Sequence, residues 1–273
     1  MSVAEGLLLG MVQGIAEFLP ISSSGHLMVV QQLLSLGDVP LLFDVFLHLA
    51  TLAAVVLFFR KKILSLFAVF FRWVLHRPPM ESLEREQEER RYIVAVLLAT
   101  LVTGVIGLAV EKKLKNLSIQ FIFIGFLVTA VFLVLSSVLE KKRKSQPAGT
   151  SISWWQGLVI GFAQGVGTLP GVSRSGSTIA GALLSGVTRE TAGEFSFIAS
   201  IPAILGAFIL EAKDLGSVSS SVGFVPVVAG CVAAFATGYA ALYCLMKIIR
   251  RGHLEWFALY LVPVGVLGLL IVR

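Results

Sequence analysis

Long apolar runs separated by charged or glycine-rich connections dominate the chain. Six of them are long enough to cross the hydrocarbon layer of a membrane, which takes about 20 residues of helix. They lie near residues 41–59, 93–110, 119–138, 191–211, 223–246 and 255–272. This pattern predicts an all-α polytopic membrane protein with six spanning helices.

A second pattern, apolar but interrupted by polar residues, occurs twice. Residues 6–25 read GLLLGMVQGIAEFLPISSSG, and residues 157–176 align with them without a gap as GLVIGFAQGVGTLPGVSRSG. A helix over residues 6–17 would rise only about 18 Å before Pro20 and the serine cluster interrupt it. We therefore expect each copy to be a re-entrant helical hairpin that is buried against protein or lines a wet cavity, because its free amides need partners.

Three spanning helices follow each hairpin, and an odd number of crossings reverses the direction in which the second hairpin enters the bilayer. The order predicts an inverted-topology repeat in a single membrane domain, residues 1–273, with repeat 1 at about 1–145 and repeat 2 at about 152–273. Discontinuous helices from two such repeats commonly build one shared site. Glycines at every fourth position, such as Gly6, Gly10 and Gly14, are expected to allow close helix packing.

Composition and charge agree with a membrane protein and add its orientation. Hydrophobic residues make up 56% of the chain and charged residues 14%, whereas soluble domains carry about 25% charged residues. Most Lys and Arg residues flank the apolar runs, in residues 60–91 and 141–144, so these connections are expected in the cytoplasm and both termini outside. The mixed-charge residues 78–91 are expected to form a solvated helix or loop. No basic stripe with aromatics is present, so no nucleic-acid partner is expected.

Glu17 is the acidic residue of the first hairpin, one helical turn after Gln13. An ionised carboxylate at membrane depth costs on the order of 3 kcal/mol, so Glu17 should face a water-filled pocket, a cation or an arginine. A role in binding a cation or a proton is the favoured interpretation. The alternative is a glutamate near the membrane interface that contacts water.

Residues 20–26 end one helix of the first hairpin and begin the next. They supply three hydroxyls, Ser22, Ser23 and Ser24, together with the imidazole of His26. A serine and a histidine are the ingredients of a nucleophile and its base. Serines before a helix are also common N-caps, and a lone histidine is often structural.

The second loop, residues 170–178, places an arginine among hydroxyls and glycines at the start of a predicted helix. Free amides and the helix dipole at such a position favour phosphate, and a guanidinium can bind two phosphate oxygens at once. The predicted phosphate-binding residues are Ser22 of the first loop and, in the second, Ser173, Arg174, Ser175, Gly176 and Thr178. In the alternative interpretation, Arg174 forms an internal ion pair with Glu17.

The motifs QGIAEFLPISSSGH and PGVSRSGST together resemble those of the undecaprenyl-diphosphate phosphatase family, the bacitracin-resistance membrane phosphatases of bacteria. The resemblance covers the whole chain. It implies removal of the terminal phosphate from a C55 polyprenyl diphosphate, which returns the lipid carrier to cell-wall synthesis. It also implies a location in the bacterial inner membrane with the site open to the periplasm.

The resemblance further implies a divalent cation, Mg²⁺ or Ca²⁺. Gln13 occupies a position where many relatives carry a glutamate, so Glu17 and Gln13 are the expected cation ligands in this chain. The implied catalytic residues are Glu17, Ser23, His26 and Arg174. Ser23 could attack phosphorus with His26 as its base, or His26 could itself attack or activate water, and the second route is favoured.

Two further possibilities remain open at the level of sequence. An inverted repeat with broken helices is also the architecture of many secondary transporters, so a carrier or a polyprenyl-phosphate flippase is the rival function. Both hairpins are expected to pack together inside one chain, surrounded by membrane lipids, which leaves a homodimer optional.

Overall fold

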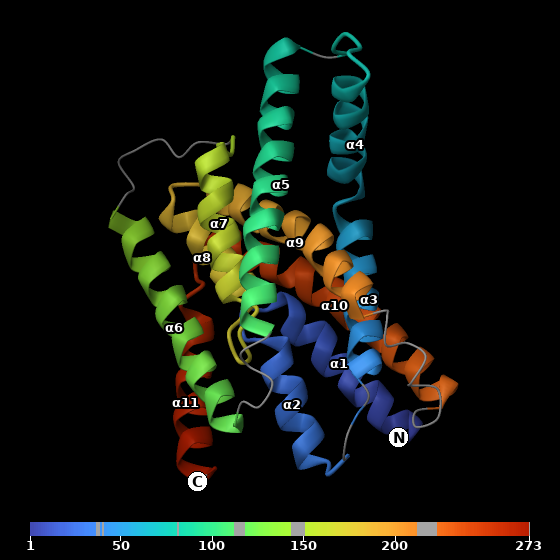
Figure 1. Cartoon of the computed structure of the whole chain (residues 1–273). Coiled ribbons are helices and arrows are strands. Elements are labelled where there is room, and N and C mark those ends of the chain that lie inside the picture. The colour runs from blue at the N-terminus through green and yellow to red at the C-terminus, as the bar shows by residue number, and fades with distance from the viewer. Residues whose placement is uncertain are drawn as a thin grey trace.

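Helices joined by turns and short loops make up the residues described in the computed structural model: 1–36, 39, 41–80, 82–111, 118–142, 151–211 and 223–272 (Figure 1). Their order is α1 (Val3–Phe18), α2 (Ser23–Leu33), α3 (Leu41–Phe58), α4 (Arg60–Val74), α5 (Leu83–Glu111), α6 (Ile119–Lys142), α7 (Trp154–Val166), α8 (Arg174–Leu184), α9 (Arg189–Glu211), α10 (Phe224–Arg251) and α11 (Trp256–Ile271). The prediction of an all-α protein is confirmed.

Several of these helices are long and apolar enough to cross a membrane. Among the described residues, α5, α6, α9 and α10 meet this description on their own. The pair α3 and α4 meets it only together and is bent by 81° at the junction, and α11 is apolar but shorter. Each of the six predicted spans thus corresponds to a helix, and the chain is a multi-pass membrane protein.

Both repeated segments form short helices that break in the middle. The first, α1, ends at Phe18, because Leu19 adopts an extended backbone conformation and Pro20 follows it. Ser22 then caps α2 by accepting a hydrogen bond from the Gly25 amide, 3.4 Å away. The corresponding break between α7 and α8 ends with Ser173, which caps α8 in the same way.

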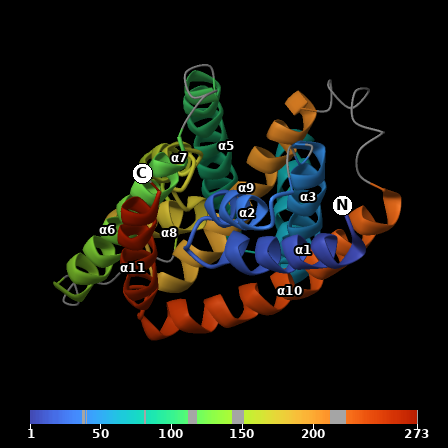
Figure 2. The ribbon, with the colours of Figure 1, turned by 90° about the horizontal axis from the view of Figure 1, so that it is seen from below.

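The glycines of α1 and α7 allow each short helix to lie directly against a long helix from the other half of the chain. Figure 2 shows α1 running alongside α10, and a Cβ atom on Gly10 would collide with the backbone of Gly230. On the other side, α7 packs against α5, and a Cβ atom on Gly161 would lie 2.6 Å from the Cα atom of Ala99. The two halves of the chain therefore interlock through backbone contacts.

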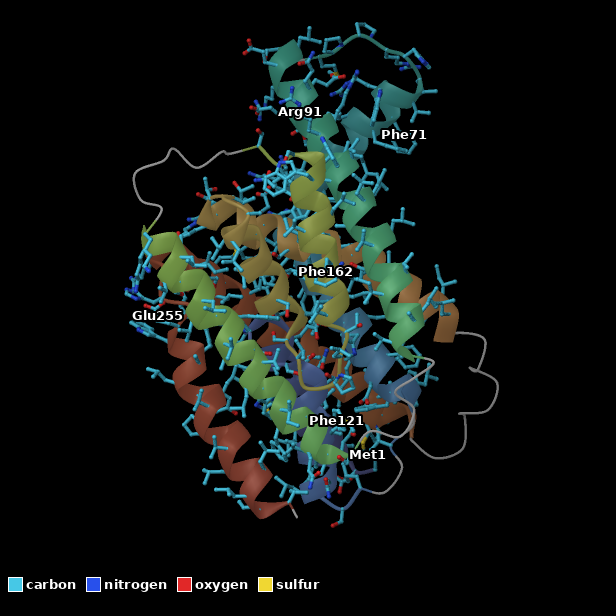
Figure 3. The ribbon with its side chains drawn as sticks, turned by 60° about the vertical axis from the view of Figure 1, so that its left-hand side comes forward. Met1, Phe71, Arg91, Phe121, Phe162 and Glu255 are labelled. Carbon is cyan, nitrogen blue, oxygen red and sulfur yellow. The ribbon has the colours of Figure 1, made fainter. Side chains whose placement is uncertain are left out.

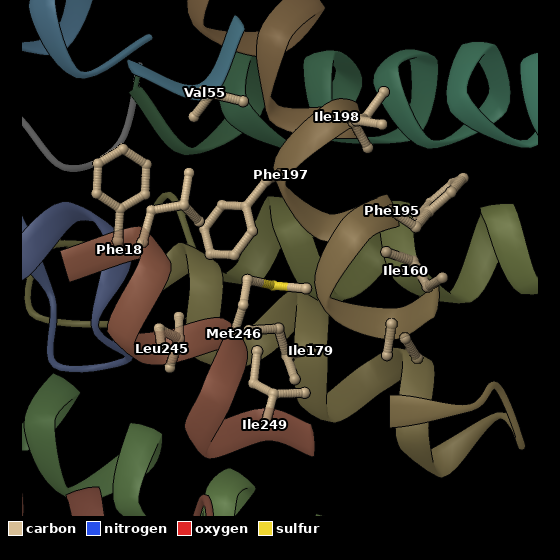
Figure 4. Packing of buried hydrophobic residues seen from close by; sticks show 14 of the residues in the cluster. Phe18, Val55, Ile160, Ile179, Phe195, Phe197, Ile198, Leu245, Met246 and Ile249 are labelled. Carbon is tan, nitrogen blue, oxygen red and sulfur yellow. The ribbon is translucent and has the colours of Figure 1, made fainter. Parts of the chain in front are cut away.

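A continuous apolar core holds the broken helices in place. Figure 4 shows Phe18 at the end of α1 close to Phe197 of α9, with their ring centroids 5.6 Å apart. Val55 of α3 and Met246 of α10 belong to the same cluster of buried side chains. Burial of one such large side chain contributes roughly 1.5–3 kcal/mol. This packing fixes the position of the residue before Phe18, which is Glu17.

The start of α5 is a helix with mostly exposed side chains, as expected for the mixed-charge residues. It packs against α4, and the pair projects from the rest of the molecule, with Phe71 and Arg91 near its end (Figure 3). Glu86 is buried there and forms ion pairs with Arg72 and Arg90 at 3.4 Å and 2.7 Å. The mixed-charge run therefore begins a helix whose buried acidic side chains are paired with basic residues. Arg143 and Lys144 of the second basic connection lie outside the described residues.

The chain ends and this projection lie at opposite ends of the molecule. In Figure 1, the start of α1 and the end of α11 lie at the lower end, whereas the end of α4 and the start of α5 lie at the upper end. This arrangement separates the termini from the basic segment of residues 60–91.

We predict that Gly10→Ala will destabilise the protein because its methyl group cannot be placed without separating α1 from α10. Overpacking of this kind costs about 1–3 kcal/mol, which corresponds to a fall in Tm of roughly 3–10 °C. Thermal unfolding of the detergent-purified protein measures the change. Gly104→Ala is the matched control, since nothing lies within 4 Å of a Cβ atom there; equal Tm values for the two variants would contradict close packing.

Candidate functional site

The carboxylate of Glu17 is the centre of a polar cluster at the break between α1 and α2. Its Oε2 atom accepts hydrogen bonds from Ser23 Oγ at 2.6 Å and from Gln13 Nε2 at 3.1 Å. The Nε2 atom of His48 lies 3.5 Å from the same oxygen, and Arg174 forms an ion pair with Oε1. Three separate parts of the chain, α1–α2, α3 and α8, thus converge on one carboxylate.

Arg174 supplies the charge that allows Glu17 to be buried. Only 5% of the Glu17 side chain is exposed, and a carboxylate in such surroundings is stable as an ion only when it is paired and hydrogen-bonded. Arg174 is the first residue of α8, so the break between α7 and α8 delivers the guanidinium to the break between α1 and α2. The ion pair considered from the sequence is therefore formed, and it joins the two repeated segments.

The backbone of the first loop is held in an unusual conformation. Ser22 has φ of 73° and ψ of 99°, a positive φ that a residue other than glycine rarely adopts. Such strain costs of order 1–3 kcal/mol and persists only where the surroundings enforce it. Its consequence is that the Ser22 hydroxyl turns to the Gly25 amide, while the next hydroxyl, Ser23 Oγ, points to Glu17.

His26 stabilises this loop conformation. Its Nδ1 atom lies 2.8 Å from the carbonyl oxygen of Ser22, which can only accept, so Nδ1 carries the proton. The Nε2 atom then accepts a hydrogen bond from the hydroxyl of Tyr260, also at 2.8 Å. The ring stacks on Phe126 with centroids 4.9 Å apart. Both ring nitrogens of His26 therefore have hydrogen-bond partners. The hydroxyl of Ser23 is hydrogen-bonded to Glu17 and not to His26.

The hydroxyls of the second loop mainly hold the start of α8. Ser173 Oγ accepts a hydrogen bond from the Gly176 amide at 3.1 Å, and Thr178 Oγ1 donates to the carbonyl oxygen of Arg174 at 2.9 Å. Ser175 Oγ lies 3.4 Å from the carbonyl oxygen of Leu19 and so touches the other loop. The predicted phosphate-binding residues are brought together, and their hydroxyls form caps and loop contacts. The first two amides of α8, those of Arg174 and Ser175, have no carbonyl partner within the helix.

A narrow cleft with a free volume of only about 10 Å³ begins at the Glu17–Arg174 pair and lies between α3 and α9. Besides apolar side chains, it is lined by hydroxyl groups from residues that the sequence analysis did not select, namely Thr51, Ser196 and Ser200. These residues and His48 lie inside apolar runs, where a polar side chain is itself a signal of a buried site. That signal was available in the sequence, but the contact between His48 and Glu17 was not.

Gln13 retains an unused oxygen beside the carboxylate. Its Oε1 atom is fully buried and has no hydrogen-bond partner among the described residues, while its Nε2 atom donates to Glu17. The equivalent Gln164 also has an unpaired Oε1 atom, but the position one turn later is Thr168, whose hydroxyl donates to the Gly165 carbonyl. Carboxylate and amide oxygens therefore lie together only in the first hairpin, and both are ligand types that Mg²⁺ and Ca²⁺ prefer.

The rest of a cation's coordination shell has no obvious protein source. The described residues contain no group of three or more His, Cys, Asp or Glu side chains that could hold a metal ion. Glu17 and Gln13 fit a cation only as two of its ligands. The remaining ligands would be water or oxygens of a bound phosphate compound.

Fold and site together define a multi-pass helical membrane protein with a buried charged site at the meeting point of two interrupted helices. The chain belongs to the family described as "Bacitracin resistance protein BacA", which it matches over residues 6–267. It is 44% identical to an undecaprenyl-diphosphatase of Treponema denticola over 98% of this chain and 97% of that protein. Proteins of the same name from Desulfatibacillum aliphaticivorans and Methanosphaera stadtmanae are 39% and 35% identical, over 96% and 99% of this chain and 95% and 98% of those proteins.

We predict that His26→Asn will retain most of the activity, because the amide of asparagine can replace the Nδ1 donor to the Ser22 carbonyl. His26→Ala removes this bond and should lower turnover by about 10–100-fold, since small errors in positioning have effects of this size. The measurement is turnover of diphosphate substrate by both purified variants. An inactive His26→Asn with an unchanged Tm would show instead that the imidazole takes part in the chemistry.

Proposed function

We propose that the protein hydrolyses undecaprenyl diphosphate to undecaprenyl phosphate and inorganic phosphate. The observation that carries this proposal is the 2.6 Å hydrogen bond from Ser23 to Glu17, next to the guanidinium of Arg174. A hydroxyl, a base and a cation at one point are what phosphoryl transfer requires. The relatives that match nearly the whole chain carry the name undecaprenyl-diphosphatase, in support of this reaction.

Ser23 is the proposed nucleophile and Glu17 its base. Ser23 Oγ attacks the terminal phosphorus while its proton passes to Glu17 Oε2, and the bond from phosphorus to the bridging oxygen breaks. Undecaprenyl phosphate leaves with that oxygen. Protonated Glu17 first passes the serine proton to solvent and becomes a carboxylate again. A water molecule then attacks the phosphoserine and gives one proton to Glu17, the bond from phosphorus to Ser23 Oγ breaks, and Glu17 returns this proton to Ser23 Oγ as phosphate leaves. Only the geometry of Ser23 and Glu17 favours this route over attack by His26 or by water alone.

Arg174 and the start of α8 are proposed to bind the phosphate groups. One nitrogen of the guanidinium is used by Glu17, and among the described residues no other partner is found for its remaining N–H groups, which could donate to phosphate oxygens. The unpaired amides of Arg174 and Ser175 and the positive end of the helix dipole favour the same anion. Ser22, Ser173, Ser175, Gly176 and Thr178 shape this pocket mainly by fixing the two loops.

A divalent cation, Mg²⁺ or Ca²⁺, is proposed to bind at Glu17 and Gln13. The support is the buried, unpaired Oε1 atom of Gln13 beside the carboxylate. Such an ion would reduce the negative charge of the diphosphate. Arg174 competes with it for Glu17, so the ion is expected to bind tightly only together with the substrate.

The two halves of the chain are proposed to be inverted repeats in the bacterial inner membrane. The packing of the helices supports this proposal. By their order in the two halves, α1 corresponds to α7 and α5 to α10, and α1 packs against α10 just as α7 packs against α5. Both termini are proposed to lie outside, since they are remote from the basic segment of residues 60–91 (Figure 1).

The site would open to the periplasm and leave the prenyl tail among membrane lipids. The reaction would recycle the carrier for peptidoglycan synthesis and so give resistance to bacitracin. A homodimer is optional, because Glu17, Ser23 and Arg174 already meet within one chain.

The deciding experiment is phosphate release from undecaprenyl diphosphate by the detergent-purified protein with Mg²⁺ or Ca²⁺. We expect Ser23→Ala to lower kcat at least about 10³-fold and Arg174→Ala about 10²–10³-fold, as loss of a nucleophile or of a charge-stabilising donor does. Ser118→Ala and Arg91→Ala are the controls, because both residues are exposed and lie outside the cluster. If the protein translocated lipid in vesicles without releasing phosphate, the proposed phosphatase activity would be rejected in favour of a carrier function.

We predict that Gln13→Glu will make stability depend on the cation. A second buried carboxylate beside Glu17 is repelled by it, so the Tm should fall in the presence of a chelator. Addition of millimolar Ca²⁺ or Mg²⁺ should restore the Tm of this variant and change that of the wild type much less. A variant whose Tm does not respond to either ion would argue against Glu17 and Gln13 as its ligands.

A further inference from the structure

The outer face of α4 carries apolar side chains where a helix in water would carry polar ones. Leu64, Phe67, Phe71 and Val74 follow one another at intervals of three or four residues, and between 54% and 66% of each is exposed. Figure 3 shows Phe71 on the projecting pair of α4 and α5. Residues at this spacing lie on one side of a helix, so the four form a single apolar stripe. An exposed stripe of this kind marks a surface that contacts something other than water.

Polar side chains of α4 contact α5 instead. Lys62 Nζ lies 3.7 Å from Oε1 of Glu89, and Ser65 Oγ donates to the same carboxylate at 2.9 Å. Further along α4, Arg72 Nε lies 3.4 Å from Oε2 of Glu86. This arrangement is the reverse of a surface helix in a soluble protein, which turns its apolar side to the protein and its polar side to water.

The same contacts show how far α4 lies from the membrane-spanning part of α5. The apolar run of α5 begins near Ile93, directly after Tyr92, whose ring centroid lies 4.9 Å from Lys62 Nζ. Arg72 pairs with Glu86, which lies about 9 Å further out along α5 at roughly 1.5 Å per residue. Lipid headgroups occupy about 5–8 Å on each side of the hydrocarbon layer, so most of α4 lies at their depth. The bend of 81° between α3 and α4 agrees, because it turns α4 away from the direction of the apolar helix α3.

Basic residues border the apolar stripe at this bend. Phe58, Phe59, Arg60, Lys61 and Lys62 line an open cavity with a free volume of about 270 Å³. Arg60 and Lys61 are exposed, no acidic partner of either is found among the described residues, and α4 itself contains neither Asp nor Glu. A cavity with three cations favours an anion, and the anions of a headgroup layer are lipid phosphates.

We propose that α4 is a lipid-binding helix. Its apolar stripe lies among the lipids at the membrane surface, and the basic cavity at its start binds the phosphate group of an anionic phospholipid. Basic amphipathic helices bind membranes through apolar burial together with attraction to anionic lipids. Lipid bound at the bend fixes the end of α3, whose residues Thr51 and Val55 line the cleft beside Glu17. The proposal does not depend on the reaction, because α4 contributes no residue to that cleft.

The first test locates the apolar stripe relative to the bilayer. Phe67→Cys and Glu84→Cys, the latter at an exposed position at the start of α5, are made in the full-length protein after replacement of Cys231 and Cys244 by alanine. Each variant is labelled with the fluorophore NBD and placed in vesicles of phosphatidylcholine and phosphatidylglycerol. We expect brominated acyl chains to quench the label of Phe67→Cys at least about threefold more than that of Glu84→Cys, and aqueous iodide to do the reverse.

Equal quenching of both labels by iodide would overturn the proposal, because the apolar stripe would then face water. Protection of the Phe67→Cys label from both quenchers would overturn it as well, since a protein surface, either a second copy of the chain or another partner, would then cover the stripe.

The second test identifies the anion. Phosphatidylglycerol should raise the Tm of the detergent-purified protein by roughly 3–8 °C more than phosphatidylcholine does, since a ligand that binds only the folded state stabilises it. The double variant Arg60→Gln with Lys61→Gln should lose most of this difference. The matched control is Lys142→Gln with Arg251→Gln, which removes the same charge from exposed positions away from the bend and should keep the difference.

Two results of this second test would contradict the proposal. Equal losses in the two double variants would make the effect one of net charge and refute a site at the bend. A Tm increase of the same size with millimolar inorganic phosphate and no added lipid would assign the cavity to free phosphate in place of a lipid headgroup.

Discussion

Burial of one carboxylate is the constraint on which the rest of the site depends. Glu17 lies at the end of a short apolar helix with almost no contact with solvent. Its charge is tolerated because a guanidinium, a hydroxyl and an amide reach it from different segments. A buried charge that loses its partner is costly by several kcal/mol, so these contacts also hold the two broken helices against each other. Stability of the fold and placement of the reactive groups therefore arise from the same interactions.

Close backbone packing gives this charged cluster a rigid support. The short helices α1 and α7 each end within the molecule, where the free ends of a helix must be satisfied by other groups. Glycines let each of them lie against the backbone of a long helix, and Phe18 anchors the end of α1 against Phe197. Reactive groups on such helix ends are held more precisely than groups on long surface loops. The interruption of each helix thus leaves amides and hydroxyls available at the point where the phosphate is proposed to bind.

Hydroxyl and imidazole groups of the site have different tasks although their residue types are the same. Ser22 and Ser173 cap helices, which leaves Ser23 as the hydroxyl directed at Glu17. His26 faces away from Glu17 and fixes the strained loop through its Nδ1 atom, whereas His48 faces Glu17 through its Nε2 atom. In both histidines Nδ1 bonds the carbonyl oxygen four residues earlier, so the two differ in what Nε2 faces: Tyr260 for His26 and Glu17 for His48. A description of the site by residue type alone would combine the two roles.

The sequence by itself determined the all-helical membrane fold, the two helix breaks and the presence of Glu17 and Arg174 in them. These features follow from local causes: apolar length sets a span, proline and serines end a helix, and a charge in an apolar segment needs a partner. The family followed from the same two motifs, and the full-length match supports it. Only the tertiary structure decided that Arg174 pairs with Glu17, that Ser23 turns to Glu17 and not to His26, and that His48 joins them. It also decided that residues 83–91 continue a helix with buried acids. Contacts between residues far apart in the sequence depend on how helices pack, and hydropathy and spacing carry no information about the direction in which a side chain on one helix meets another.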